Sequence, residues 1–97
     1  MRVKFHPEAR ADLREGNAFY RHRSPLAAVA FMHQIETALS RISEAPSRYP
    51  AGEYGTREHV LPSSFPYTIV YRVRESFVVI VAIAHHSREP RYWHHRV

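Results

Sequence analysis

The sequence predicts an α+β fold of order β-α-α-β-β-β, in which a helical hairpin packs on one face of a small, mainly antiparallel sheet. Two patterns carry this prediction. Apolar residues recur at helical spacing in the first half of the chain, and they alternate or run together as in strands in the second half. A length of 97 residues suits one compact unit, so we expect a single domain over residues 1–97.

The chain begins with a short strand and a helix. Residues 2–6 alternate between apolar and basic side chains, which predicts a half-buried strand. Pro7 ends that strand and suits the first turn of a helix, which we expect over residues 7–22. Gly16 lies inside this helix, where glycine lowers the helix propensity. We expect Gly16 to allow the close approach of another backbone.

A second helix follows almost immediately. Ser24 can cap it with its hydroxyl, and Pro25 suits its first position. We expect the helix to end near Glu44, because Pro46 disfavours the helical conformation in the residue before it. One apolar stripe runs along it, formed by Ala28, Met32, Ile35, Leu39 and Ile42 and widened by Phe31 and Ala38. Two helices joined by so short a link form an antiparallel hairpin.

The second half of the chain reads as three strands and a tail. A loop with two prolines and two glycines covers residues 46–56, and the predicted strands cover residues 57–61, 67–74 and 77–84, with a proline-rich break over residues 62–66. The last strand is almost entirely apolar, as expected of a central strand covered on both sides. A short helix or tail then ends the chain.

The turn between the last two strands sets which side chains share a face. If Glu75 and Ser76 form the turn, one face carries Tyr67, Ile69, Tyr71, Val73, Val78, Ile80, Ala82 and Ala84. The other face carries Thr68, Val70, Arg72, Val79, Val81, Ile83 and His85. The first face is more apolar and has small alanines, so we assign the helical hairpin to it. The second face is then open or covered by a partner.

The charge of the chain is strongly basic. Lys and Arg number 14 against 9 acidic residues, which gives a net charge of +5, and every basic residue except Lys4 is arginine. Arginine offers a rigid fork of donors that suits phosphate and carboxylate groups. The balance therefore favours a nucleic acid or an acidic protein as partner, and a basic, well-solvated surface is the alternative.

The composition also excludes several classes of protein. There is no cysteine, which excludes disulfide scaffolds, thiolate metal sites and cysteine nucleophiles. No apolar run is long enough for a membrane span, and the first residues lack the apolar stretch of a signal peptide. We therefore expect a cytoplasmic protein with no membrane partner.

The densest polar cluster follows the last predicted strand, over residues 85–96. It combines side chains that can transfer protons, arginines that can bind phosphate and aromatic rings that can stack on bases. These are the groups that a metal-independent ribonuclease needs. The candidate catalytic residues are Arg88, His85, His86 and Tyr92. The candidates for binding phosphate or nucleic acid are Arg72, Arg74, Arg91, Arg96 and Trp93.

A structural role is the alternative for several of these residues. Trp93 packs more readily than it stacks on a ligand, and with Tyr92 it could pin a short terminal helix to the sheet. Arg72 is explained equally well as an exposed strand arginine. The adjacent histidine pairs, at residues 85–86 and 94–95, can each offer one metal ligand easily but not two. We therefore predict no metal site and no cofactor.

Three stretches of sequence make a specific combination in order along the chain. They are His6-Pro7-Glu8-Ala9 with Asp12-Leu13; Phe65-Pro66-Tyr67 with Ile69-Val70-Tyr71-Arg72-Val73; and Val81-Ala82-Ile83-Ala84-His85 followed by Arg88-Glu89-Pro90 and Tyr92-Trp93. This combination resembles the RelE/ParE superfamily of type II toxin–antitoxin toxins, also described as plasmid stabilisation system proteins. The resemblance covers essentially the whole chain.

The resemblance implies a toxin that a cognate antitoxin neutralises, in a complex that commonly binds and represses its own promoter. Superfamily members include endonucleases that cut ribosome-bound messenger RNA and inhibitors of DNA gyrase. We expect growth inhibition by cleavage of ribosome-bound mRNA. The alternatives are a non-enzymatic gyrase inhibitor and a degenerate toxin kept for antitoxin binding.

The superfamily pattern is only partly matched at individual residues. Arg88 and Tyr92 match the arginine after the last strand and the C-terminal aromatic of RelE-like nucleases. Thr68 stands where an arginine usually follows the third-strand aromatic, and Arg72 could replace the missing charge. The histidine after the last strand, His85, also resembles the ParE-like branch, so both branches stay open.

Overall fold

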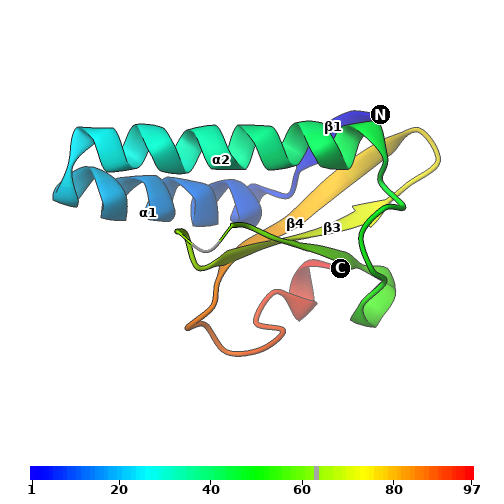
Figure 1. The fold of residues 1–97 in the computed structure, drawn as a ribbon. Coiled ribbons are helices and arrows are strands. Elements are labelled where there is room, and N and C mark those ends of the chain that lie inside the picture. The colour runs from blue at the N-terminus through cyan, green and yellow to red at the C-terminus, as the bar shows by residue number, and fades with distance from the viewer. Residues whose placement is uncertain (63) are drawn as a thin grey trace.

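The computed structural model describes residues 1–62 and 64–97 as one sheet with two long helices on one side (Figure 1). Its elements are β1 (Arg2–Phe5), α1 (Pro7–Arg23), α2 (Pro25–Glu44), β2 (Arg57–Val60), β3 (Tyr67–Val73) and β4 (Phe77–His85), with short 3-10 turns at Glu53–Gly55 and His94–Arg96. The predicted order and the α+β class are confirmed. The break predicted over residues 62–66 includes Ser63, which lies outside the described residues.

The sheet has the strand order β1-β4-β3-β2, so the most apolar strand is central, as predicted. The β2–β3 and β3–β4 pairs are antiparallel, whereas β1 pairs with β4 in parallel. A parallel pair needs a crossover connection, and here it runs from β1 through the α1–α2 hairpin, β2 and β3 to β4. No helix in the described part of the chain is long and apolar enough to cross a membrane.

Side-chain caps set the ends of both helices. The His6 Nδ1 atom accepts a hydrogen bond of 3.0 Å from the backbone N–H of Glu8 at the start of α1. Ser24 accepts from the backbone N–H of Leu26 through its hydroxyl oxygen, at 3.2 Å, and so caps α2. The Ser24 backbone N–H also donates to the carbonyl of Tyr20 at the end of α1. One residue therefore ends the first helix and begins the second.

Gly16 allows aromatic side chains to approach α1. A Cβ atom at this position would lie 2.9 Å from Phe31 Cζ and 3.1 Å from the Tyr67 hydroxyl oxygen, too close for either side chain. The prediction that another backbone approaches Gly16 is wrong, because aromatic side chains occupy this space. The rings of Phe31 and Tyr67 lie 5.0 Å apart, centre to centre, in the core beneath the helices.

A β-bulge interrupts the β3–β4 pairing. Near the turn the register is as predicted, with Arg72 opposite Val79. Between Tyr71 and Val70 the register shifts by one residue, so that Val70 lies opposite Ala82 and Val81 is the extra residue of β4. Because strand side chains alternate, one extra residue exchanges the faces of everything that follows it.

The bulge overturns part of the predicted face assignment. Ile83 lies on the helix-covered face among the core residues, and His85 pairs with Tyr67 on that same face. Ala82 and Ala84 lie on the opposite face. The prediction that the two alanines face the helices, and that Ile83 and His85 face away, is therefore wrong.

The outer face of the sheet, on the side away from the helices, is covered by the chain itself. After β4 the C-terminal segment folds back beneath the sheet, as Figure 1 shows. Trp93 is only 4% exposed and packs against Val70, Val81 and Ala82. The packing role predicted for Trp93 is confirmed, and the prediction that this face is open or covered by a partner is wrong.

Candidate functional site

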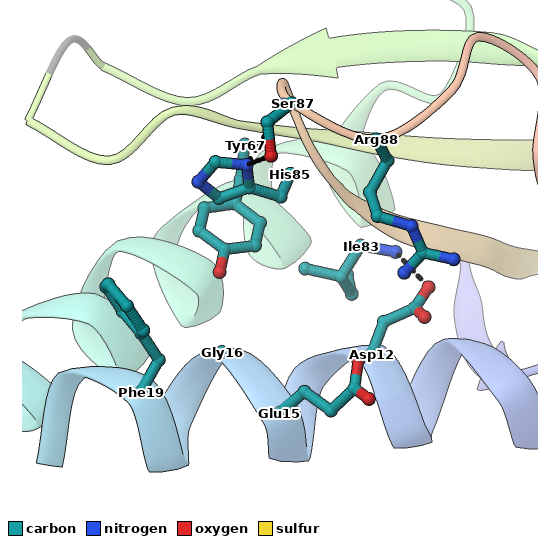
Figure 2. Close-up of a pocket in the computed structure, with 9 residues that line it drawn as sticks. All are labelled: Asp12, Glu15, Gly16, Phe19, Tyr67, Ile83, His85, Ser87 and Arg88. Atoms are coloured by element: carbon teal, nitrogen blue, oxygen red, sulfur yellow. Dashed lines mark hydrogen bonds between the residues drawn. The ribbon is translucent and has the colours of Figure 1, made fainter. Parts of the chain in front are cut away.

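Two hollows flank the end of β4. The first, here called the α1 cleft, has a volume of about 420 Å³ and lies between α1 and the loop after β4 (Figure 2). It is lined by Asp12, Glu15, Gly16, Phe19, Tyr67, Ile83, His85, Ser87 and Arg88. The second, here called the outer groove, has a volume of about 260 Å³ and lies on the outer face of the sheet. Its polar side chains are Glu53, Glu58, Thr68, His85, His86, Arg88, Glu89, Arg91 and Tyr92.

The structure brings only some of the predicted site residues together. His86, Arg88, Arg91, Tyr92 and Trp93 line the outer groove, and His85 and Arg88 line both hollows. Arg74 lies at the exposed β3–β4 turn and Arg72 lies beside Gly55, so neither lines the groove. Arg96 belongs to the C-terminal segment, and its side chain is 5% exposed, paired with Asp12.

The two adjacent histidines make different contacts. The Nδ1 atom of His85 accepts from the backbone N–H of Ser87 at 3.0 Å and lies 2.7 Å from the Ser87 hydroxyl. A backbone N–H can only donate, so Nδ1 is the acceptor and the neutral ring of His85 carries its proton on Nε2. His86 instead places Nε2 2.9 Å from the hydroxyl of Thr68 in the outer groove.

Arg88 stacks on Tyr92 at the junction of the two hollows. The guanidinium carbon lies 3.8 Å from the centre of the Tyr92 ring, and Arg88 is otherwise exposed. Stacking leaves the donors at the edge of the guanidinium free for a ligand. The Tyr92 hydroxyl donates to Asp12 Oδ2 at 3.0 Å. Burial, and then the neighbouring Asp12 carboxylate, raise the pKa of Tyr92, so its hydroxyl stays protonated.

Asp12 organises this end of the molecule, although it was not among the predicted site residues. Its buried carboxylate accepts from the backbone N–H of Ile83 at 3.2 Å and from Arg96 Nη1 at 2.6 Å, in addition to Tyr92. Arg96 Nη1 also donates to the carbonyl of Val81 at 3.1 Å. Because β1 ends before it reaches this part of β4, the two side chains supply hydrogen bonds that a longer strand would have made.

One signal in the sequence could have revealed Asp12. It lies between Ala9 and Gly16 on the buried stripe of α1. A carboxylate in such a stripe needs a buried partner, since an unpaired charge there is strongly unfavourable. The sequence alone does not show that Arg96, rather than another arginine, is the partner of Asp12.

The outer groove has no excess of positive charge. The carboxylates of Glu53, Glu58 and Glu89 line it together with only two arginines. One of these, Arg91, forms a 3.0 Å ion pair with Glu53. Among residues 1–62 and 64–97, no group of three or more His, Asp or Glu side chains is placed to hold a metal ion.

The comparisons with known proteins identify the family. Residues 3–90 match the family described as the ParE toxin of the type II toxin–antitoxin system parDE. The chain belongs to this ParE toxin family. The RelE/ParE resemblance stated from the sequence is thereby confirmed, with the type II toxin class that it implies. A search of curated proteins found no match.

A solved structure has the same fold. The chain is similar to a structure described as the chromosomal ParDE toxin–antitoxin system from P. aeruginosa, with a TM-score of 0.75 and 21% sequence identity. The match covers 88% of this chain and 95% of that chain. At 21% identity this likeness shows the fold alone. Neither comparison refers to RNA binding or ribonuclease activity.

Proposed function

We propose that this ParE-family toxin stops growth by inhibiting DNA gyrase without cutting RNA, and that a cognate antitoxin neutralises it. The charge of the outer groove carries the choice between the two targets. RNA cleavage needs a cation beside the scissile phosphate. Three carboxylates line the groove against two arginines, and Glu53 already pairs with one of them. An RNA phosphate would therefore meet little net positive charge there.

The proton-transfer groups support the same choice. A metal-independent nuclease needs a base and an acid that converge on one phosphate. His85 pairs with Tyr67 on the helix-covered face, whereas His86 bonds Thr68 in the outer groove. Tyr92 donates its proton to Asp12 and is held protonated. His85 also lines the groove, but its Nδ1 atom accepts from Ser87. This arrangement suits a binding surface better than a catalytic one.

The antitoxin proposal rests on the family and on the charge. Toxins of a type II pair are held inactive by a protein partner. The net charge of +5 on this chain suits a partner with an acidic segment that wraps the toxin. We expect the toxin to act in the cytoplasm, and its complex with the antitoxin to bind promoter DNA.

Cleavage of ribosome-bound mRNA is the second candidate, because the outer groove does bring His86, Arg88 and Tyr92 together. Induced expression separates the two. The gyrase proposal predicts growth arrest, a DNA-damage response and messages whose 5′ ends are unchanged shortly after induction. New 5′ ends at codon-defined positions, without a damage response, would instead establish the nuclease. Normal growth with the folded protein present would point to a degenerate toxin.

Arg88 is the residue through which we expect the toxin to engage its target. Arg88→Ala should abolish growth arrest without loss of fold, because Arg88 is exposed and stacks only on Tyr92. Arg48→Ala is the matched control, since Arg48 is exposed on a loop and lines neither hollow. Full toxicity of a folded Arg88→Ala variant would remove Arg88 from the proposal.

A further inference from the structure

The α1 cleft is larger than the outer groove and has the size of a ligand site. Its volume of about 420 Å³ lies within the usual range for small-molecule pockets. Its walls come from two facing elements. Glu15 and Phe19 project from α1, and Ser87 and Arg88 come from the loop after β4, as Figure 2 shows. A single ligand can therefore contact both elements at once.

One end of the cleft suits a flat aromatic ring. Phe19 is 47% exposed and lines the cleft beside Gly16, and the Arg23 guanidinium carbon lies 4.6 Å from the centre of its ring. Tyr67 and Ile83 form the wall on the sheet side. Exposed aromatic side chains that line a cleft are common platforms on which unpaired bases stack.

Glu15 selects among the bases. It lies one helical turn before Phe19 on the same face, within reach of the edge of a ring stacked there. Among residues 1–62 and 64–97 it takes part in no ion pair. A carboxylate only accepts hydrogen bonds. Guanine presents two adjacent donors, N1–H and N2–H, whereas adenine and cytosine each place a ring acceptor beside their amino group.

The loop after β4 supplies a positive charge that can bind a phosphate. Arg88 keeps its edge donors free while it stacks on Tyr92. The Ser87 hydroxyl is not a second donor, because it lies 2.7 Å from His85 Nδ1 and donates its proton there. Asp12 adds little repulsion, because its carboxylate is already bound by Arg96, Tyr92 and the backbone of Ile83. The Tyr67 hydroxyl is neutral at cellular pH, since burial raises the pKa of Tyr67 to about 12.

We propose that the α1 cleft binds the guanosine 5′-monophosphate unit, with the base stacked on Phe19 and bonded to Glu15 and the phosphate held by Arg88. The unit could be a free nucleotide or an unpaired guanosine of an RNA chain, because both present the same groups. This site shares His85 and Arg88 with the outer groove, but its base-binding residues, Phe19 and Glu15, line only the α1 cleft, and the proposal does not depend on gyrase inhibition.

The test is a titration of the isotope-labelled chain followed by amide NMR shifts, with GMP, AMP, CMP, guanosine and inorganic phosphate as probes. GMP should shift the amides of residues 15–19 and 85–88, and it should bind about ten- to a hundredfold more tightly than AMP, as one bidentate pair typically provides. Guanosine and phosphate alone should each bind more weakly than GMP. An unstructured oligonucleotide with one guanosine separates the two sources: tighter binding than GMP indicates RNA, and weaker binding indicates the free nucleotide.

Two variants make the result decisive. Glu15→Gln should reduce the affinity for GMP to that for AMP, since its amide offers one acceptor in place of two. Glu75→Gln is the matched control, because Glu75 is also exposed but lies at the β3–β4 turn, away from the cleft. Absence of GMP shifts, equal shifts with all nucleotides, or an undiminished GMP preference in Glu15→Gln would each overturn the proposal.

Discussion

The two faces of the sheet are covered in different ways. On the inner face, helix side chains such as Phe31 and Ile35 pack on β-strand residues with almost no exposure. On the outer face, a smaller apolar cluster lies under Trp93, and polar contacts hold the covering segment. The strongest of these is the buried pair of Asp12 and Arg96, and Tyr54 stacks on His94 at 3.9 Å.

This difference separates stability from the position of the site. Apolar burial is non-directional and supports the whole fold, so its loss weakens every element. Hydrogen bonds and ion pairs are directional, so a change of one atom can release a segment. We therefore expect inner-face variants to affect global stability, and outer-face variants to affect where Arg88 and Tyr92 lie.

The largest expected effect comes from the inner face. Phe31→Ala should lower the free energy of unfolding by about 3–5 kcal/mol, because the ring is fully buried among Tyr20, Phe65 and Tyr67. Urea denaturation followed by circular dichroism measures this. Leu26→Ala is the control, since Leu26 is 79% exposed and should change the stability by less than about 0.5 kcal/mol. Equal stabilities of the two variants would contradict the contrast.

The second effect comes from the buried ion pair. Asp12→Asn should lower the free energy of unfolding by about 1.5–3 kcal/mol, because the Arg96 guanidinium loses its charged partner. It should also raise the exposure of Trp93 to a fluorescence quencher while the helical circular dichroism is retained. The double variant Asp12→Asn/Arg96→Met should lose less than the sum of its parts. Strict additivity, with an unchanged Trp93 signal, would show that the pair does not hold the segment.

High pH should test one tyrosine on each face. Burial raises the pKa of Tyr67 to about 12 and also raises the pKa of Tyr92. Unfolded tyrosine ionises near about pH 10, so the unfolded chain loses protons first and stability falls as the pH rises from about 10 to 12. Urea midpoints across this range should drop, and either Tyr67→Phe or Tyr92→Phe should flatten the drop.

The same two variants should differ at neutral pH. Tyr92→Phe removes the hydrogen bond to Asp12, which leaves the buried carboxylate with one donor fewer. Tyr67→Phe removes a hydroxyl that faces the α1 cleft. Tyr92→Phe should therefore be the less stable of the two at pH 7. The reverse order would contradict the role given to Asp12.

The smallest expected effect is at the rim of the outer groove. Glu53→Gln should change the free energy of unfolding by no more than about 0.5 kcal/mol, because the Glu53 and Arg91 side chains are 61% and 49% exposed and solvent screens their attraction. Urea denaturation at low and high salt measures this. A loss as large as that of Asp12→Asn would show that the ion pair, rather than Asp12, holds the C-terminal segment.

Local signals made most of the fold predictable. The Ser24-Pro25 start and the apolar stripe of α2 depend only on residues close in sequence. The β-bulge at Val81 was not predictable, because no local residue type marks it and it exchanges the faces of Ile83 and His85. The polar cluster after β4 was visible in the sequence. Its organiser was not, because Asp12 and Arg96 lie 84 residues apart and only the folded chain pairs them.

The central claim, that the outer surface binds a protein target and does not cut RNA, is tested most directly with purified components. The toxin is added to DNA gyrase and a relaxed plasmid, and separately to ribosomes that carry a defined message. We predict that supercoiling is inhibited, that the cognate antitoxin restores it, that Arg88→Ala does not inhibit, and that the message stays intact. Normal supercoiling together with codon-specific cuts in the message would contradict the account.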